Sequence, residues 1–115
     1  MELYYHDVDR DVLILSADGG LDSTSAEAFV SDLTRLAQAG ARKLLVDCTR
    51  LVYLSSYGLA VLVRLHKKLA EAGGDVKLAA VDSRVARLID VAGLSSVFHM
   101  YPNVDEARRA FRESD

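Results

Sequence analysis

The sequence has little cysteine and proline and no excess of basic residues. Its 115 residues include one cysteine, one proline and no tryptophan, and the formal net charge is −3. The single cysteine, Cys48, has no internal disulfide partner, which fits a reducing compartment. A nucleic-acid-binding domain needs a basic face, and so does a protein that binds anionic membranes. The charge therefore favours neither class.

Long hydrophobic runs are also missing. No apolar run approaches the roughly 20 residues of a membrane-spanning helix. The first residues, MELYYHDVDRD, are acidic where a signal peptide has a basic segment followed by an apolar core. We therefore expect a cytoplasmic protein without a membrane span. The composition, 50% hydrophobic and 27% charged, is typical of a globular domain that folds without disulfides or metals.

Sequence signatures of catalytic and metal sites are absent. The chain has no P-loop, no GxGxxG motif, no HExxH and no GxSxG. Its histidines, His6, His66 and His99, lack metal-ligand spacing, and His99 is interpreted as structural. His66 is ten residues from Ser56 on one expected helix, about 15 Å away, too far to activate that serine. We expect no catalytic residue, no metal and no cofactor, and predict that the protein is not an enzyme.

Hydrophobic periodicity predicts strands that alternate with helices after an initial hairpin. Strands are predicted over 3–8, 11–17, 43–48, 76–81 and 97–101, and helices over 24–40, 56–72, 83–92 and 104–111. A loop over 18–24 is expected to contain Gly19 and Gly20. This order predicts one α/β domain over residues 1–115, with a mixed, mostly parallel sheet of about five strands and about four flanking helices.

The predicted core follows the apolar faces of these helices. Cys48 is interpreted as a small buried hydrophobic residue, and Gly73 and Gly74 are expected to end the helix over 56–72. Arg64, Lys67 and Lys68 are expected on its solvated face. The predicted core residues of the two central helices are Leu59, Leu62, Val63, Leu65, Leu69, Val85, Leu88, Ile89 and Ala92.

Two adjacent serines stand at the start of the helix over 56–72. Ser55 can serve as the N-cap, because its hydroxyl can accept a hydrogen bond from a free backbone N–H of the first turn. Ser56 then lies in the first turn, exposed and close to unpaired N–H groups. The positive end of the helix dipole tolerates a phosphate there, and a phosphoserine adds about −1.5 to −2 charge. Ser56 is therefore either a modification site or a simple neighbour of the cap.

The segment LVDCTRLVYLSSYGLAVLVRLHKKLAEAGGDVKLAAVDSRVARLIDVAGL resembles the STAS domain of bacterial anti-sigma factor antagonists. LILSADGGLDSTSAEAF is similar to the family's strand–G-x-L-D–helix segment, and VFHMYPNVDEARRAF resembles its final strand and helix. The resemblance spans nearly the whole chain. It implies a STAS fold and a partner that is an anti-sigma factor and serine kinase of ATP-binding fold. Phosphorylation releases the antagonist, a serine phosphatase resets it, and sigma-factor-dependent transcription is regulated in this way.

The family pattern at the start of this helix is often Asp-Ser-Ser/Thr-Gly-Leu, with the first hydroxyl residue modified. Aligned on Gly58 and Leu59, Ser56 falls on the phosphoacceptor, Ser55 on the aspartate and Tyr57 on the second hydroxyl residue. The missing aspartate puts kinase recognition in doubt. The resemblance also places Asp47 near the acceptor. The partner-binding residues that it implies, together with the exposed face of the same helix, are Gly20, Asp22, Ser55, Ser56, Tyr57, Ala60 and Arg64.

Tyr57 has two interpretations, a partner-facing anchor or an aromatic side chain folded over the neighbouring loop. The whole chain also has two rival functions. One is a STAS subunit or scaffold, in a lipid-transport or stress-signalling assembly, that binds constitutively without phosphorylation. The other is a domain that binds a nucleotide or another small ligand, which would need a pocket with converging polar groups. We expect a monomer or a weak dimer.

Overall fold

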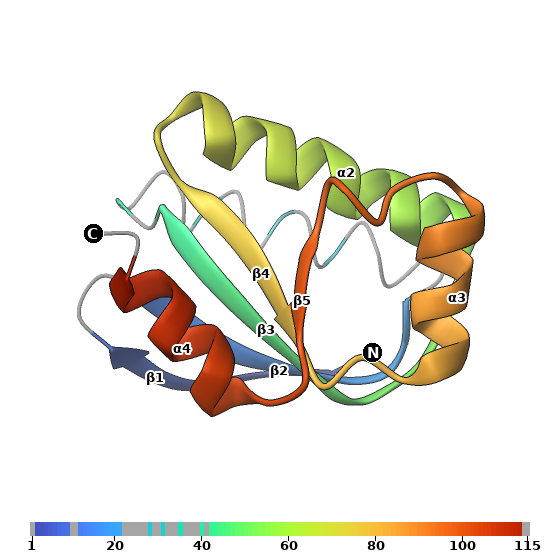
Figure 1. The fold of residues 1–115 in the computed structure, drawn as a ribbon, viewed down its shortest axis with the longest axis horizontal. Coiled ribbons are helices and arrows are strands. Elements are labelled where there is room, and N and C mark those ends of the chain that lie inside the picture. The colour runs from blue at the N-terminus through green and yellow to red at the C-terminus, as the bar shows by residue number, and fades with distance from the viewer. Residues whose placement is uncertain are drawn as a thin grey trace.

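A computed structural model of the chain describes residues 2–9, 12–21, 28, 31, 35, 40 and 42–113. Two strands come first, and strands and helices then alternate (Figure 1). The strands are β1 (Glu2–Asp9), β2 (Val12–Leu21), β3 (Lys43–Leu54), β4 (Asp75–Ala79) and β5 (His99–Tyr101). The helices are α2 (Ser56–Glu71), α3 (Ser83–Val91) and α4 (Val104–Glu113).

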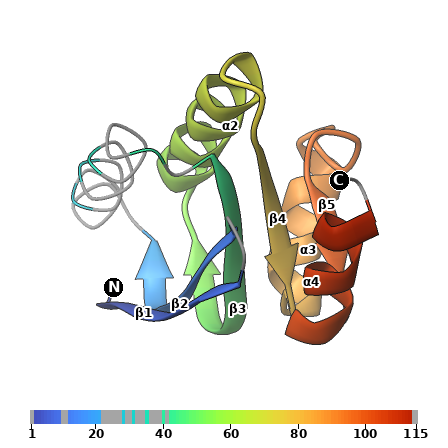
Figure 2. The ribbon, with the colours of Figure 1, turned by 90° about the vertical axis from the view of Figure 1, so that its left-hand side faces the viewer.

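The strands form one mixed sheet in the order β1-β2-β3-β4-β5. β1 pairs with β2 antiparallel, as expected for a hairpin, and the other three pairs are parallel. Figure 2 shows the hairpin at one edge of the sheet and β5 at the other. Parallel neighbours need a crossover, and α2 and α3 supply those from β3 to β4 and from β4 to β5. The predicted α/β class with a mostly parallel sheet is confirmed.

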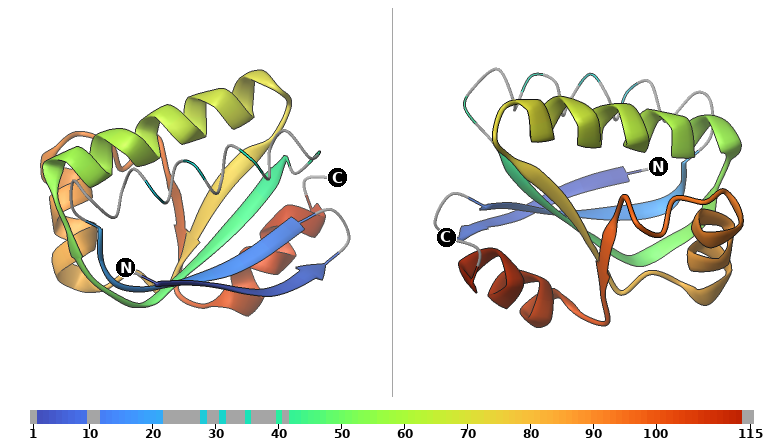
Figure 3. Two further views of the ribbon diagram at one scale, coloured as in Figure 1. Left: turned by 180° about the vertical axis from the view of Figure 1, so that it is seen from behind. Right: turned by 45° about the horizontal axis from the view of Figure 1, so that its top comes forward.

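Apolar clusters cover the two faces of the sheet. On one face, Val46 of β3 packs with Leu65 of α2 and Ile89 of α3. On the other face, Leu45 packs with Phe111 of α4. Figure 3 (left) shows α2 in front of the strands and α4 behind them. Since Leu45 and Val46 are consecutive and face opposite ways, β3 is buried on both sides, as its continuous apolar run predicts.

The predicted helix faces are largely correct. Leu59, Leu62, Leu65 and Leu69 are buried in α2, and Val85 and Ile89 are buried in α3. Val63 and Leu88 are only partly buried. Val61, which the prediction omitted, is fully buried because it lies one turn before Leu65 on the inner face. Ala92 is exposed, contrary to the prediction, because it is the C-cap of α3 and lies beyond the packed face.

Strand β3 is longer than predicted, reaching Leu54 instead of residue 48. Beyond Cys48, only Leu51 and Leu54 are buried, so burial recurs every third residue rather than every second. Strand β2 is longer as well, because residues 18–21 pair with this second half of β3. Gly19 and Gly20 therefore lie in a strand and not in the predicted loop. Two register shifts interrupt this pairing, and such irregularities hide a strand from a period-two search.

Strands β4 and β5 are shorter than predicted. β4 ends at Ala79, because Ala80 has a φ of 57° and leaves the strand conformation. β5 begins at His99 rather than residue 97. The backbone N–H groups of Val97 and Phe98 donate to the carbonyl oxygen of Leu94, at 3.0 and 3.3 Å, and so belong to a turn.

The helix predicted over 24–40 falls mostly outside the described residues. Within it, Ala28, Ser31 and Arg35 are helical and exposed, and Gly40 lies in a turn. These three residues are spaced i, i+3 and i+7, which is one side of a helix. They fall between the apolar positions of the predicted inner face.

Candidate functional site

The two serines have different roles at the start of α2. Ser55 is the N-cap, since its Oγ accepts a hydrogen bond from the Gly58 N–H at 2.9 Å, as predicted. Ser56 is the first helical residue and is exposed, and its hydroxyl makes no hydrogen bond to any residue that the structure describes. The first turn of α2 contains no acidic residue. The positive end of the helix dipole is therefore not neutralised within its own helix.

The same end of the sheet brings β2 close to this helix start. Gly20 pairs with Tyr53 and Leu21 pairs with Leu54, the residue before the N-cap. Gly20, predicted from the resemblance as a partner-binding residue, therefore lies on the strand that borders the serines. Asp22, the other residue predicted from that segment, lies outside the described residues.

The predicted residues farther along α2 are on its outer side. Ala60 and Arg64 are both exposed, and with Ser56 they are spaced i, i+4 and i+8. Residues at this spacing form one stripe along a helix. The stripe runs along the solvent face, because the buried positions of α2 lie on the opposite side.

Exposed hydrophobic residues lie close to the serines along the chain. Tyr57 is 40% exposed, Tyr53 is 55% exposed and Val52 is 59% exposed. All three lie within three residues of the N-cap, Ser55, along the chain. Large exposed aromatic residues are enriched where proteins bind partners. The sequence did not indicate Val52 and Tyr53 as site residues, because it predicts no strand between residue 48 and the helix over 56–72. We call Val52, Tyr53, Ser56 and Tyr57 the helix-mouth patch.

Asp47 is separated along the chain from the start of α2, because β3 continues for seven residues beyond Asp47. Its Oδ1 accepts from Thr49, at 3.1 Å from the backbone nitrogen and 2.6 Å from Oγ1. Its Oδ2 lies 3.5 Å from the Ser16 hydroxyl oxygen. The contacts with Thr49 give Asp47 a structural role, because they hold the chain that follows it. Its expected position near the acceptor stays a prediction.

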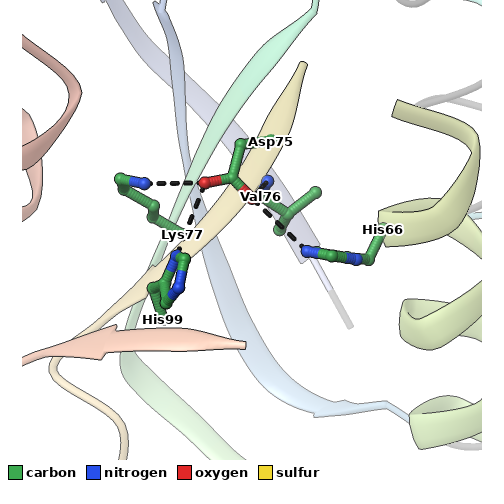
Figure 4. Close-up of polar contacts among 5 residues, drawn as sticks. All are labelled: His66, Asp75, Val76, Lys77 and His99. Atoms are coloured by element: carbon green, nitrogen blue, oxygen red, sulfur yellow. Dashed lines mark hydrogen bonds and ion pairs between the residues drawn. The ribbon is translucent and has the colours of Figure 1, made fainter. Parts of the chain in front are cut away.

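A separate charged cluster lies at the far end of α2, centred on Asp75 (Figure 4). Asp75 Oδ2 lies 2.7 Å from Lys77 Nζ and 3.6 Å from His99 Nδ1. Asp75 Oδ1 lies 3.3 Å from His66 Nε2 and accepts from the Val76 N–H at 2.8 Å. Burial alone would raise the pKa of Asp75, but Lys77, the Val76 N–H and His99 together hold it below its ordinary value.

The described residues offer little for catalysis or metal binding. They contain no group of three or more histidine, cysteine, aspartate or glutamate side chains suited to a metal ion. Cys48 is buried, as predicted, and burial, with a smaller effect of the Asp47 carboxylate, raises the pKa of its thiol to about 12. A neutral thiol is a poor nucleophile. Among the same residues, no helix combines the length and apolar character needed to cross a bilayer.

Comparison with known proteins shows the family. The model of the STAS domain matches residues 6–107. The chain belongs to the STAS domain family. Its relatives in this family include BtrV of Bordetella bronchiseptica, which is named as a candidate anti-sigma factor antagonist. BtrV is 29% identical over 101 residues, which cover 88% of this chain and 87% of BtrV. The anti-sigma F factor antagonist of Paenibacillus polymyxa is 26% identical, over 90% of this chain and 86% of that protein.

Solved structures of STAS proteins share the fold. The anti-sigma factor antagonist SpoIIAA in its unphosphorylated form superposes with a TM-score of 0.84 at 19% identity, over 97% of both chains. The phosphorylated form of SpoIIAA from Bacillus superposes with a TM-score of 0.76 at 18% identity, over 96% of this chain and 99% of that one. At these identities the likeness establishes the fold and leaves the function to be argued from the site.

Proposed function

We propose that this STAS protein is an anti-sigma factor antagonist that phosphorylation of Ser56 switches off. Its partner is an anti-sigma factor that is also a serine kinase of ATP-binding fold, and a serine phosphatase restores the active form. The protein acts in the bacterial cytoplasm and is not itself an enzyme. The observation that carries this proposal is the exposed Ser56 at the start of α2, with exposed Val52, Tyr53 and Tyr57 within four residues of it along the chain.

The local geometry supports a switch that leaves the fold intact. A phosphate on Ser56 would stand in solvent at the positive end of α2, where no acidic residue of the first turn repels it. A partner covering Tyr53 and Tyr57 would have to bury the same phosphate. Burying a charge without a matching partner costs far more than exposing it. Phosphorylation therefore weakens binding while the fold is kept.

The names of its relatives support the same proposal. The two relatives named above are described as anti-sigma factor antagonists, one of them as a candidate, and SpoIIAA has been solved in unphosphorylated and phosphorylated forms. Serine replaces the aspartate of the family pattern at position 55 without loss of the cap, because both residue types are good N-caps. What changes is the carboxylate beside the acceptor, and this affects kinase recognition.

The test is a pull-down from native lysate with wild type, Ser56→Ala and Ser56→Glu as baits. We expect wild type and Ser56→Ala to retain a kinase of ATP-binding fold. The amount of kinase that Ser56→Glu retains should be at least about tenfold lower, which corresponds to about 1.4 kcal/mol of binding free energy. Incubation of the retained kinase with ATP should label wild type but not Ser56→Ala.

The matched control is Ser83, the first residue of α3, which is exposed and follows its own N-cap, Asp82. Ser83→Glu places the same charge at the same position of another helix, so it should retain the kinase as well as wild type does. Equal retention by all three Ser56 baits would show constitutive binding and would overturn the switch.

A further inference from the structure

A cleft opens beside the carboxyl-terminal half of α2, away from Ser56. It lies where the second half of α2 meets the starts of β4 and β5 and the end of α4, and its volume is about 710 Å³. Volumes of roughly 300–1,000 Å³ are typical of small-molecule sites. Helix α2 has 16 residues, so its two ends are separated by about 24 Å. The cleft is therefore separate from the helix-mouth patch.

The cleft is positively charged although the protein is negative overall. Lys43, Lys67 and Lys77 line it, together with His66 and His99, and Asp75 is the only carboxylate among the lining residues that the structure describes. The formal charges of these described residues sum to +2 with both histidines neutral, against −3 for the whole chain. A concave surface lined by one sign of charge concentrates the field and attracts ligands of opposite sign.

Asp75 does not neutralise this set of side chains. Its two oxygens are shared among Lys77, His66, His99 and the Val76 N–H, as Figure 4 shows. Lys77 is only 5% exposed, and its ammonium also lies 4.4 Å from the centroid of the Phe111 ring. Lys67 is exposed on α2 and makes no ion pair with any residue that the structure describes. Lys67 is thus a cation of the cleft that a second anion can approach.

We propose that this cleft binds a small organic phosphate, with the phosphate group near Lys67 and His99. Lys67 supplies positive charge for a phosphate anion, His99 offers a ring nitrogen for a hydrogen bond, and lysine is a common phosphate ligand. The cleft is far larger than one phosphate group, and Val97 and Phe111 supply apolar surface for the organic part. Neither the helix mouth nor the STAS partner is required for this binding.

The experiment is a titration of the full ¹⁵N-labelled chain followed by amide NMR shifts. The probes are ribose 5-phosphate, inorganic phosphate, and ribose as the uncharged match, all at constant ionic strength set with sodium chloride. We expect saturable shifts around Lys67, Asp75 and His99 with ribose 5-phosphate, weaker binding of inorganic phosphate, and no saturable shift with ribose. Residues 52–57 should not shift.

Two exposed lysines on the same helix give matched variants. Lys67→Gln removes a cation that lines the cleft, whereas Lys68→Gln removes its neighbour, which does not. We expect Lys67→Gln to weaken ribose 5-phosphate binding about threefold to tenfold and Lys68→Gln to leave it unchanged. His99→Gln, at another exposed position of the cleft, should also weaken binding.

Several results would overturn the proposal. They are the absence of saturable shifts with ribose 5-phosphate, equal losses for Lys67→Gln and Lys68→Gln, and shifts centred on the helix mouth. Binding of inorganic phosphate as tight as that of ribose 5-phosphate would also overturn it, because the cleft would then contribute nothing to an organic ligand. None of these measurements uses the kinase, so they succeed or fail independently of the proposed switch.

Discussion

Helix α2 presents an exposed serine and exposed aromatic side chains at its amino-terminal end, whereas its carboxyl-terminal half contacts the charged cluster around Asp75. At the first end, the hydrogen bond that the structure describes for the Ser55 hydroxyl comes from a neutral group, the Gly58 N–H. At the second end, one carboxylate joins β4, β5 and α2 through Lys77, His99 and His66. A modification at the first end adds a charge to solvent. A change at the second end disturbs a carboxylate that is shared by several partners.

The largest expected effect in this comparison is that of Asp75→Asn. This change leaves the Lys77 ammonium, 5% exposed, without its counter-charge. Removing one partner of a buried ion pair is more costly than removing both. We expect a loss of about 2–4 kcal/mol in the free energy of unfolding, measured by urea denaturation. The double variant Asp75→Asn/Lys77→Met should recover part of this loss.

The matched variant for Asp75→Asn is Asp47→Asn, on the neighbouring strand β3. Asp47 accepts hydrogen bonds only from neutral groups of Thr49 and Ser16 in the contacts that the structure describes, and an asparagine keeps one acceptor oxygen. We expect a loss of about 0.5–1.5 kcal/mol. If Asp47→Asn were as destabilising as Asp75→Asn, the two aspartates would not differ in the way that their contacts indicate.

The pH dependence of stability should distinguish the two aspartates further. The pKa of Asp75 is lowered in the folded state, so the unfolded chain binds its proton more readily. The contribution of Asp75 is therefore fully present above the ordinary aspartate pKa of about 3.9 and is lost as pH falls through the lower folded value. The stability difference between wild type and Asp75→Asn should be constant above about pH 5 and should shrink below about pH 4. A difference independent of pH down to full acid unfolding would contradict this.

The sequence predicted the two termini of α2 better than the cluster around Asp75. Capping by Ser55 and termination at Gly73 are local, since each depends on residues within one turn. Gly73 has a φ of 83°, and its N–H and that of Gly74 donate to Ala70 and Leu69. An added Cβ at Gly74 would lie 1.8 Å from the Arg42 carbonyl oxygen, so this position requires glycine. The cap and the terminating glycine are readable without the fold, whereas the close approach of Gly74 to Arg42 is not.

The cluster around Asp75 depends on tertiary contacts and was not predicted. It needs the β4–β5 register that places Lys77 opposite His99, and it needs α2 to bring His66 to the start of β4. His99 was interpreted as a structural histidine, and its side chain is 60% exposed beside Asp75. One local signal existed, because Asp75 and Lys77 are two residues apart on a strand and so share a face. The sequence did not predict the second half of β3 for a similar reason, because the pairing of this half with β2 is long-range and irregular.

A smaller effect is expected for Ser55→Ala at the helix mouth. The change removes the acceptor of the Gly58 N–H, and loss of an N-cap costs about 1 kcal/mol. Ser55→Asp should keep the stability of wild type within about 0.5 kcal/mol, because aspartate caps equally well. Urea denaturation of both variants checks this. Equal losses for alanine and aspartate would mean that the hydroxyl acts through something other than the cap.

The smallest expected effect on stability is that of Ser56→Glu. The side chain is exposed, so no packing is lost, and the new carboxylate lies at the positive end of a helix whose first turn has no other acid. We expect stability to be unchanged or to rise by about 0.3–1 kcal/mol, decreasing with added salt. Ser83→Glu is the control, and it should gain less because Asp82 already places a carboxylate at that helix start.

The stability of Ser56→Glu decides how the binding experiment is interpreted. If Ser56→Glu keeps its stability and loses the kinase, the lost binding comes from charge at the interface. If Ser56→Glu unfolds in less urea than wild type by the equivalent of more than about 1 kcal/mol, the helix mouth is coupled to the fold and the contrast between the two ends of α2 fails.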